Sequence, residues 1–172
     1  RLDNSDTSDS SVVIKNNMGA GGYISSISVD PYDGNKVMAS FSNYNIKSIY
    51  YSENAGESWT DVSGNLEEFP NGQGSGPSVR SVYIYPLKFQ YRYFAGTSTG
   101  LYSTDKLDGK DTKWIQEGSS TIGNIVVDMI AGRPADGYIA IATHGNGMYS
   151  SNFESEILSI DEPFTPNTFN LG

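Results

Sequence analysis

Residues 52–59 read Ser-Glu-Asn-Ala-Gly-Glu-Ser-Trp and combine the residue types that close a tight β-hairpin. The side chain of Asn54 can hydrogen-bond the backbone of the turn, and Gly56 can adopt a positive φ that most residues avoid. Trp59 adds a large apolar side chain that anchors the returning strand. The stretch therefore predicts two antiparallel strands joined by a hydrogen-bonded turn, and we interpret it as a folding device.

Outward from this hairpin, the same succession of segments occurs three times. Apolar and aromatic runs of strand length, separated by Gly, Pro, Asn and Asp, fill residues 23–70, 77–120 and 123–153. Tyr50, Tyr102 and Tyr149 hold corresponding places at intervals of about 50 residues, the length of four short strands with their turns. The third unit ends before a fourth strand. Many tyrosines and glycines and few charged residues also favour an all-β protein.

The hairpin motif carries a resemblance to a known family. Residues 52–59 match the pattern S-x-[DN]-x-G-x-[ST]-W, and the second unit has a longer version of it. Residues 23–153 resemble the Asp-box β-propellers (BNR or sialidase-type repeats), a group that includes sialidases, sortilin-like receptors and xyloglucanase-type glycosidases. The resemblance implies blades of four antiparallel strands. It assigns structural Asp-box roles to Ser52, Asn54, Gly56, Ser58, Trp59, Asp105, Gly109 and Trp114.

Three blades are too few to close a ring, because propellers have about four to eight. We therefore expect the chain to be the C-terminal part of a larger ring, and a ring assembled from copies of the chain is the alternative. The fourth strand of the third unit must then come from elsewhere. Residues 11–16, inside a polar lead-in over residues 1–22, are a candidate closing strand.

The C-terminal part of the sequence adds a second resemblance. GTSTGLYSTD (residues 96–105) and ATHGNGMYSS (residues 142–151) are similar to the final blades of large secreted propellers of Bacteroidetes-type bacteria. EPFTPNTFNLG (residues 162–172) resembles the segment that introduces a type IX secretion sorting domain, so we interpret residues 154–172 as a linker toward such a domain. The resemblance implies a secreted or cell-surface bacterial protein.

Composition excludes several classes of function. Twenty acidic residues against eleven basic ones give a net charge of -9, which repels phosphate backbones, so we expect no nucleic-acid partner. No apolar run is long enough to cross a membrane, and we expect no membrane insertion. Zero cysteines exclude disulfides and thiolate metal sites. We predict no cofactor and no metal site.

Candidate binding residues gather in the loops between the second and third strands of each unit. In the propeller fold these loops share one face, and they contain the ligand-face candidates Asn43, Tyr44, Thr97, Ser98, His144 and Asn146. His144, the one histidine, is either a turn residue or a base and hydrogen-bond donor to a sugar. Asp128 is either a strand-end residue or part of the channel wall. No complete catalytic constellation is present, so we assign no catalytic residue.

Two hypotheses of function follow. In the first, the chain is a non-catalytic binding or scaffold module of a secreted Asp-box propeller that engages protein or glycan. In the second, it holds the C-terminal blades of a propeller glycoside hydrolase whose catalytic residues lie mostly outside this chain, because such hydrolysis needs two carboxylates. The expected partners are the remaining blades of the same protein, with other surface proteins, secretion machinery or glycans as further candidates.

Overall fold

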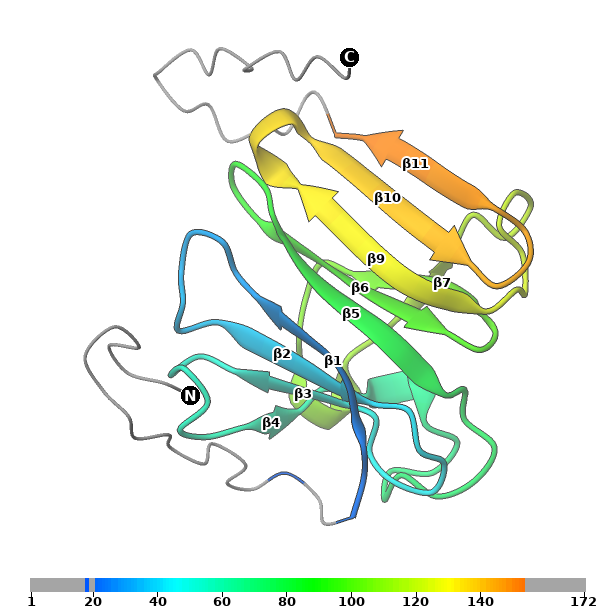
Figure 1. Ribbon diagram of the computed structural model, residues 1–172. Helices are drawn as coiled ribbons and strands as arrows, with labels where there is room; N and C mark the ends of the chain where they lie inside the picture. Colours follow the sequence, from blue (N-terminus) through cyan, green and yellow to red (C-terminus); the bar gives the residue numbers. More distant parts are fainter. Residues whose placement is uncertain (1–17, 19–20, 154–172) are drawn as a thin grey trace, which may run out of the picture.

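The computed structural model describes residue 18 and residues 21–153, which form three antiparallel sheets, here called blades 1, 2 and 3 (Figure 1). Blade 1 contains β1 (Ile24–Val29), β2 (Val37–Phe41), β3 (Ile49–Ser52) and β4 (Thr60–Asp61). Blade 2 contains β5 (Val79–Pro86), β6 (Tyr91–Thr97), β7 (Gly100–Thr104) and β8 (Ile115–Glu117). Blade 3 contains β9 (Val127–Arg133), β10 (Tyr138–Thr143) and β11 (Met148–Asn152). Short 3-10 helices occupy three connections: η1 (Gly64–Leu66), η2 (Gly109–Asp111) and η3 (Pro134–Asp136).

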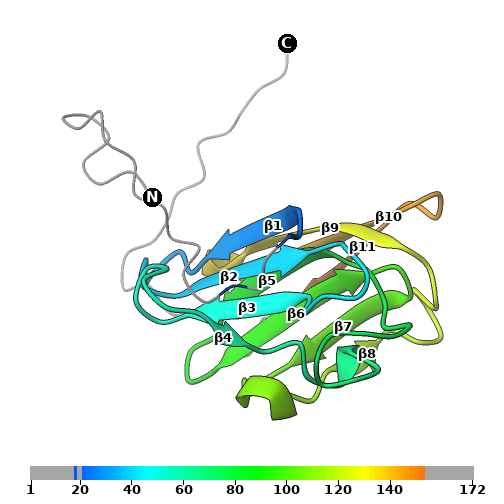
Figure 2. The ribbon, with the colours of Figure 1, turned by 90° about the horizontal axis from the view of Figure 1, so that it is seen from below.

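The blades follow one another in chain order. The first strands β1, β5 and β9 lie next to one another (Figures 1 and 2), and β4 and β8 lie farther out (Figure 2). The predicted all-β fold with four antiparallel strands per blade is confirmed, and blade 3 has three strands within the described residues. The candidate closing strand at residues 11–16 and the linker at residues 154–172 lie outside the part of the chain that the structure describes.

The hairpin of blade 1 is held by a small network of side-chain hydrogen bonds. The Ser52 hydroxyl accepts the backbone N–H groups of Asn54 and Gly56 at 3.2 and 2.8 Å. The Asn54 side chain accepts the N–H of Ser58 and donates to its hydroxyl, both at 2.9 Å. Gly56 has φ +87°, and Trp59 is buried in an apolar cluster of blade 1 with Val37, Ala39, Phe41 and Tyr50. Local polar groups thus satisfy the turn backbone, so the hairpin can form between β3 and β4.

The longer hairpin of blade 2 closes differently. Thr104 takes the place of Ser52: its hydroxyl accepts the N–H of Lys106 and donates to the Lys106 carbonyl. Within residues 21–153, Asp105 makes no hydrogen bond or ion pair, whereas the motif predicts that Asp105 holds this turn. Gly109, with φ +54°, begins η2, and Trp114 is buried with its indole N–H donating to the Val62 carbonyl at 2.9 Å. The strand register makes Thr104 the counterpart of Ser52, so Asp105 corresponds to Glu53 and not to Asn54.

Two apolar clusters bind the blades together. The first interblade core lies between blades 1 and 2 and includes Met38, Ile49, Val62, Leu66, Val82, Ile84, Tyr93, Ala95 and Trp114. The second interblade core lies between blades 2 and 3 and includes Tyr85, Phe94, Leu101, Val127, Ile130, Ile139 and Ile141. Burial of these side chains, at about 25 cal/mol for each Å² removed from water, is the main force that stacks the blades.

Serine hydroxyls set the register between neighbouring blades. A first strand has one unpaired edge, whose N–H groups need acceptors. The Ser26 hydroxyl of β1 accepts the N–H of Val82 in β5 at 3.3 Å, and the Ser81 hydroxyl of β5 accepts the N–H of Ile130 in β9 at 3.2 Å. The two bonds join corresponding positions, so each blade docks on the next in the same way.

The first strands of the outer blades carry exposed apolar side chains. Ile27 and Val29 of β1 are 62% and 51% exposed, whereas Val82 and Ile84, at the same register positions of β5, are 2% and 0% exposed because blade 1 covers them. On the far side of blade 3, Met129 of β9 is 62% exposed. The exposure is confined to the first strand in blade 1, because Ala39 and Phe41 of β2 are buried in a separate cluster.

Candidate functional site

The loops after β2, β6 and β10 lie at one end of the blades, beside the starts of the first strands, and we call this end the ring face. The Ser78 hydroxyl, just before β5, donates to the Ser42 carbonyl after β2 at 2.7 Å. The backbone N–H of His144, after β10, donates to the Val126 carbonyl before β9 at 2.9 Å. The first contact joins the loops of blades 1 and 2, and the second lies within blade 3, beside the start of its first strand.

Each first strand begins with a β-bulge whose extra residue lies on the ring face. The register shifts leave Ser25 in β1, Arg80 in β5 and Asp128 in β9 without an opposed residue on the neighbouring strand. A bulge re-aims the side chain of the extra residue, and bulges are common beside functional sites. The three residues therefore form a row across the three blades.

Asp128 is the centre of this row. Its carboxylate accepts from Arg80 Nη1 at 2.9 Å and lies 3.2 Å from His144 Nδ1. Because a carboxylate only accepts hydrogen bonds, a hydrogen bond between these atoms requires the proton on Nδ1. The His144 side chain is 77% exposed, so the pair faces solvent. Exposed pairs of this kind contribute little to stability, about 0–1 kcal/mol.

A shallow hollow of about 460 Å³ lies along the row. Its lining side chains carry serine hydroxyl groups, one guanidinium and one carboxylate, and Tyr44 adds an exposed aromatic ring. Hydroxyl-rich ligands suit such a surface, since every lining group can donate or accept a hydrogen bond and the ring can stack. The lining residues are Ser25, Ser42, Tyr44, Ser78, Arg80 and Asp128.

The six ligand-face candidates divide into exposed and structural residues. Tyr44 and His144 are exposed on the ring face, and Asn146 donates from its side chain to the Tyr149 hydroxyl at 2.7 Å. Asn43 accepts the N–H of Tyr23 at 2.7 Å, and the Ser98 hydroxyl accepts the N–H of Ser78 at 3.1 Å.

Thr97 is a correction to the expected ligand face. Its side chain is completely buried, where the hydroxyl donates to the Gly100 carbonyl and accepts the N–H of Thr99. It closes the two-residue turn between β6 and β7 and cannot touch a ligand. Ser25 and Arg80 also line this hollow, which the sequence pattern did not indicate because only the bulges bring them to this face.

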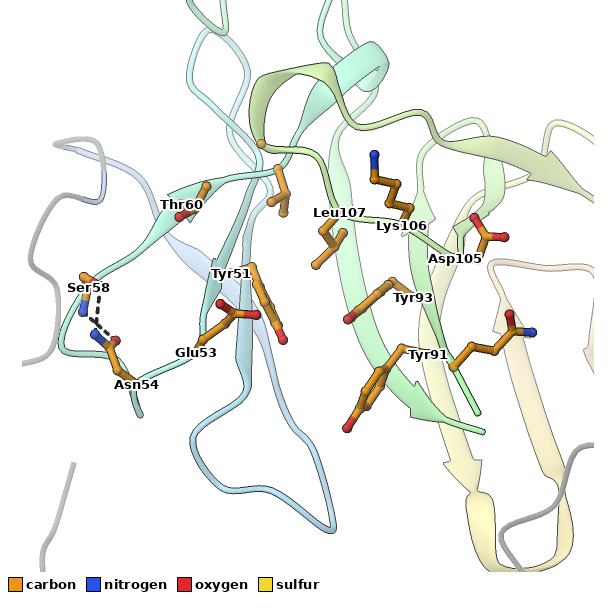
Figure 3. Close-up of a pocket in the computed structure, with 13 residues that line it drawn as sticks. Tyr51, Glu53, Asn54, Ser58, Thr60, Tyr91, Tyr93, Asp105, Lys106 and Leu107 are labelled. Atoms are coloured by element: carbon orange, nitrogen blue, oxygen red, sulfur yellow. Dashed lines mark hydrogen bonds between the residues drawn. The ribbon is translucent and has the colours of Figure 1, made fainter. Parts of the chain in front are cut away.

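A second hollow, of about 530 Å³, lies at the opposite end between the hairpins of blades 1 and 2 (Figure 3). Tyr51 and Tyr93 meet edge to face with ring centroids 5.8 Å apart, and Tyr91 stacks on Tyr93 at 5.9 Å. Tyr51 and Tyr93 are each 7% exposed, and burial raises the pKa of both phenols. Lys36 donates to the Tyr91 hydroxyl at 3.1 Å. These tyrosines serve mainly as packing between the blades.

Neither a metal centre nor a membrane span is found in the described part of the chain. Residue 18 and residues 21–153 contain no group of three or more His, Asp or Glu side chains placed to hold a metal ion. They also contain no helix long and apolar enough to cross a membrane.

Comparison with known proteins shows the fold. No family model and no curated protein matches the chain. Among solved structures, an ancestral GH74 enzyme superposes with a TM-score of 0.53 at 20% identity, over 81% of this chain and 19% of that one. The GH74 enzyme of Niastella koreensis gives 0.50 at 17% identity, over 80% and 22% of the two chains. The chain thus spans about a fifth of the length of these structures, and its fold is of the β-propeller type that they share.

Proposed function

We propose that the chain forms consecutive blades of a larger β-propeller and that its ring face is a non-catalytic binding or scaffold surface for a glycan or a protein. The contrast between the first strands carries the proposal: Ile27 and Val29 are exposed where Val82 and Ile84 are buried. A face built to pack against a neighbouring blade has no such neighbour among the described residues. The expected partners are therefore further blades of the same protein.

The ring face supports binding more directly than hydrolysis. Asp128 is the one carboxylate that lines the hollow, and Arg80 and His144 both hold it. Glycoside hydrolysis needs two carboxyl groups about 5–9.5 Å apart. Tyr44 and the lining hydroxyls suit the stacking and hydrogen bonding by which proteins hold sugar rings or polar protein loops.

The blade proposal is tested by one substitution in two settings. In the 172-residue chain, Val29→Asp changes an exposed side chain and should alter the free energy of unfolding by no more than about 0.5 kcal/mol. In a polypeptide that carries the further blades, the same aspartate would be buried without a partner and should cost about 3 kcal/mol or more. Urea denaturation measures both. Equal small effects in the two settings would refute the proposal.

The binding proposal is tested on the same polypeptide with a glycan array and with surface proteins of the source cells. Tyr44→Ala and Asp128→Asn should each weaken a detected ligand, whereas Lys113→Ala, at an exposed site remote from the ring face, should leave its affinity unchanged. Equal affinity for all three variants would exclude the ring face as the binding surface.

A second candidate is a propeller glycoside hydrolase, and the likeness to GH74 structures favours it. On this alternative, Asp128 would act with a second carboxylate from a blade outside this chain, and polysaccharides such as xyloglucan would be the substrate class. Asp128→Asn in the longer polypeptide should then abolish release of reducing sugar while leaving polysaccharide binding largely intact. A pure binding module would show no turnover at all.

The finer assignments belong to the same proposal. The hydrogen bonds of residues 52–59 support an Asp-box hairpin in blade 1. The similarity of residues 162–172 to the start of a type IX sorting region supports a secreted or cell-surface location in a bacterium. Detection of the protein in the culture medium or on the cell surface, and its loss from there when the secretion system is disrupted, would test this route.

A further inference from the structure

The hollow of about 530 Å³ at the end opposite the ring face, here called the hairpin-end hollow, is built by two blades (Figure 3). Blade 1 supplies Tyr51 of β3 and Glu53 of the following hairpin. Blade 2 supplies Tyr93 of β6, with Asp105 and Leu107 from the hairpin between β7 and β8. The hydroxyl groups of Tyr51 and Tyr93 point toward one another across the hollow (Figure 3). A ligand in this space therefore contacts both blades.

The charge in the hairpin-end hollow is negative and unbalanced. Its one basic lining residue, Lys106, is already paired with Asp108 at 3.0 Å. The lining carboxylates belong to Glu53 and Asp105, which are exposed and make no hydrogen bond or ion pair within the described residues. A concave surface with charge of one sign and partly apolar walls concentrates its electric field. The hollow therefore attracts a cation.

Glu53 acts on the same point as the two phenol groups. Burial is the largest cause that raises the pKa of Tyr51 and of Tyr93, and the negative charge of Glu53 adds to the increase for both. The phenols are therefore neutral at pH 7, and each oxygen has lone pairs that can accept a hydrogen bond. A cationic donor between them can pair with the Glu53 carboxylate and donate to the phenol oxygens at the same time.

The tyrosine rings offer no open face on which a sugar could stack. Tyr51 and Tyr93 are each 7% exposed. Tyr91 stacks on Tyr93 with an interplanar angle of 21°, and Lys36 Nζ lies over the Tyr91 ring, 4.8 Å from its centroid. A guanidinium group suits the hollow better, because its five N–H donors in one plane reach a carboxylate and neighbouring oxygen atoms together. The half-buried Leu107 provides an apolar contact for the methylene groups of such a side chain.

We propose that the hairpin-end hollow binds an arginine side chain of a partner protein. Glu53 pairs with the guanidinium group, the oxygens of Tyr51 and Tyr93 accept its hydrogen bonds, and Asp105 adds negative charge from the opposite wall. The inference goes beyond the proposed function and does not depend on it, since the hollow and the ring face lie at opposite ends of the blades. The arginines of the described residues already form ion pairs with other carboxylates, and these are Arg80, Arg92 and Arg133.

The test uses the 172-residue chain labelled with ¹⁵N and the peptide acetyl-Gly-Arg-Gly-amide as the probe. Titration should shift the backbone amide signals of residues 53–58 and 105–109 in a saturable manner. The same peptide with citrulline in place of arginine has nearly the same shape but no charge, and it should bind at least about tenfold more weakly. In the chain, Glu53→Gln should weaken binding of the arginine peptide about tenfold. Glu57→Gln is the matched control, because it makes the same change in the same hairpin at an exposed residue that does not line the hollow, and it should alter the affinity by less than about twofold.

Several results would overturn the inference. Absence of saturable shifts in the two hairpins would show that the hollow is not a binding site, and equal affinity of the arginine and citrulline peptides would show that charge is not recognised. Equal effects of Glu53→Gln and Glu57→Gln would indicate general attraction to an acidic surface. Cellotetraose is titrated in parallel, and if it shifts the same signals with an affinity equal to that of the arginine peptide, the hollow is a glycan site instead. The amide spectrum of each variant also reports whether its fold is retained.

Discussion

Trp114→Ala is the most informative single substitution for the stacking of blades 1 and 2. The indole is 2% exposed in the first interblade core, and its N–H donates to the Val62 carbonyl at 2.9 Å. Removing a buried tryptophan side chain costs about 3–5 kcal/mol, and leaving the buried carbonyl without its donor adds about 1 kcal/mol. Since domains of this size are stable by about 5–15 kcal/mol, the variant should retain little stability.

Trp114→Phe separates the two contributions. Phenylalanine keeps most of the apolar contact but has no N–H, so we expect a loss of about 1–2 kcal/mol. Lys113→Ala, at the neighbouring exposed residue, should change stability by no more than about 0.5 kcal/mol. Urea denaturation followed by circular dichroism gives all three values. A Trp114→Ala chain within about 1 kcal/mol of the parent would show that the indole does not hold the blades together.

Three further predictions address other contacts of the fold. Ser81→Ala removes the hydroxyl that accepts an N–H of β9, and urea denaturation should show a loss of about 1–2 kcal/mol. Burial raises the pKa of Glu67, so the stabilisation from its proton is present below the ordinary pKa of a glutamate and is lost as pH rises through the folded-state pKa. The stability of Glu67→Gln relative to the parent should therefore increase as pH rises above the ordinary pKa, and a difference that does not change with pH would contradict this. Gly132→Ala would place a Cβ 2.5 Å from the Tyr83 ring and should cost about 1–3 kcal/mol of stability. Gly34→Ala has no atom within 4 Å of its new Cβ and should change stability by less than about 1 kcal/mol. Similar melting temperatures for the two variants would refute the packing argument.

Much of the fold could be predicted because its signals repeat. The spacing of Tyr50, Tyr102 and Tyr149 predicts that they hold equivalent positions in the three units. The strand registers confirm this, since the three tyrosines lie opposite Ala39, Ala95 and Ile141 on the second strands of their blades. Asp105 differs, because the strand register aligns Thr104 with Ser52 and Asp105 with Glu53, one residue away from the motif alignment. The motif therefore predicts the hairpin of blade 2 but not which of its side chains bonds the backbone.

The ring face was harder to predict than the strands. Its location followed from the order of strands within a blade, yet Thr97 proved to be buried while Arg80 and Ser25 lie in the hollow. A one-residue bulge decides which side of a strand each side chain occupies, and no local pattern marked the bulges. Asp128 and His144 are separate candidates in the sequence, and the structure brings the His144 ring within 3.2 Å of the Asp128 carboxylate.

Local sequence is enough to predict the hairpin at residues 52–59 and short strands in three repeated units. These depend on hydrogen bonds and φ preferences between residues close along the chain, which act before any distant contact forms. The ion pair of Arg80 with Asp128, the hollow between the hairpins of blades 1 and 2, and the exposure of Ile27 and Val29 depend on how whole blades pack. Contacts between blades join residues roughly one repeat apart, and the contact of His144 with Asp128 within blade 3 depends on a bulge, so no local pattern encodes either.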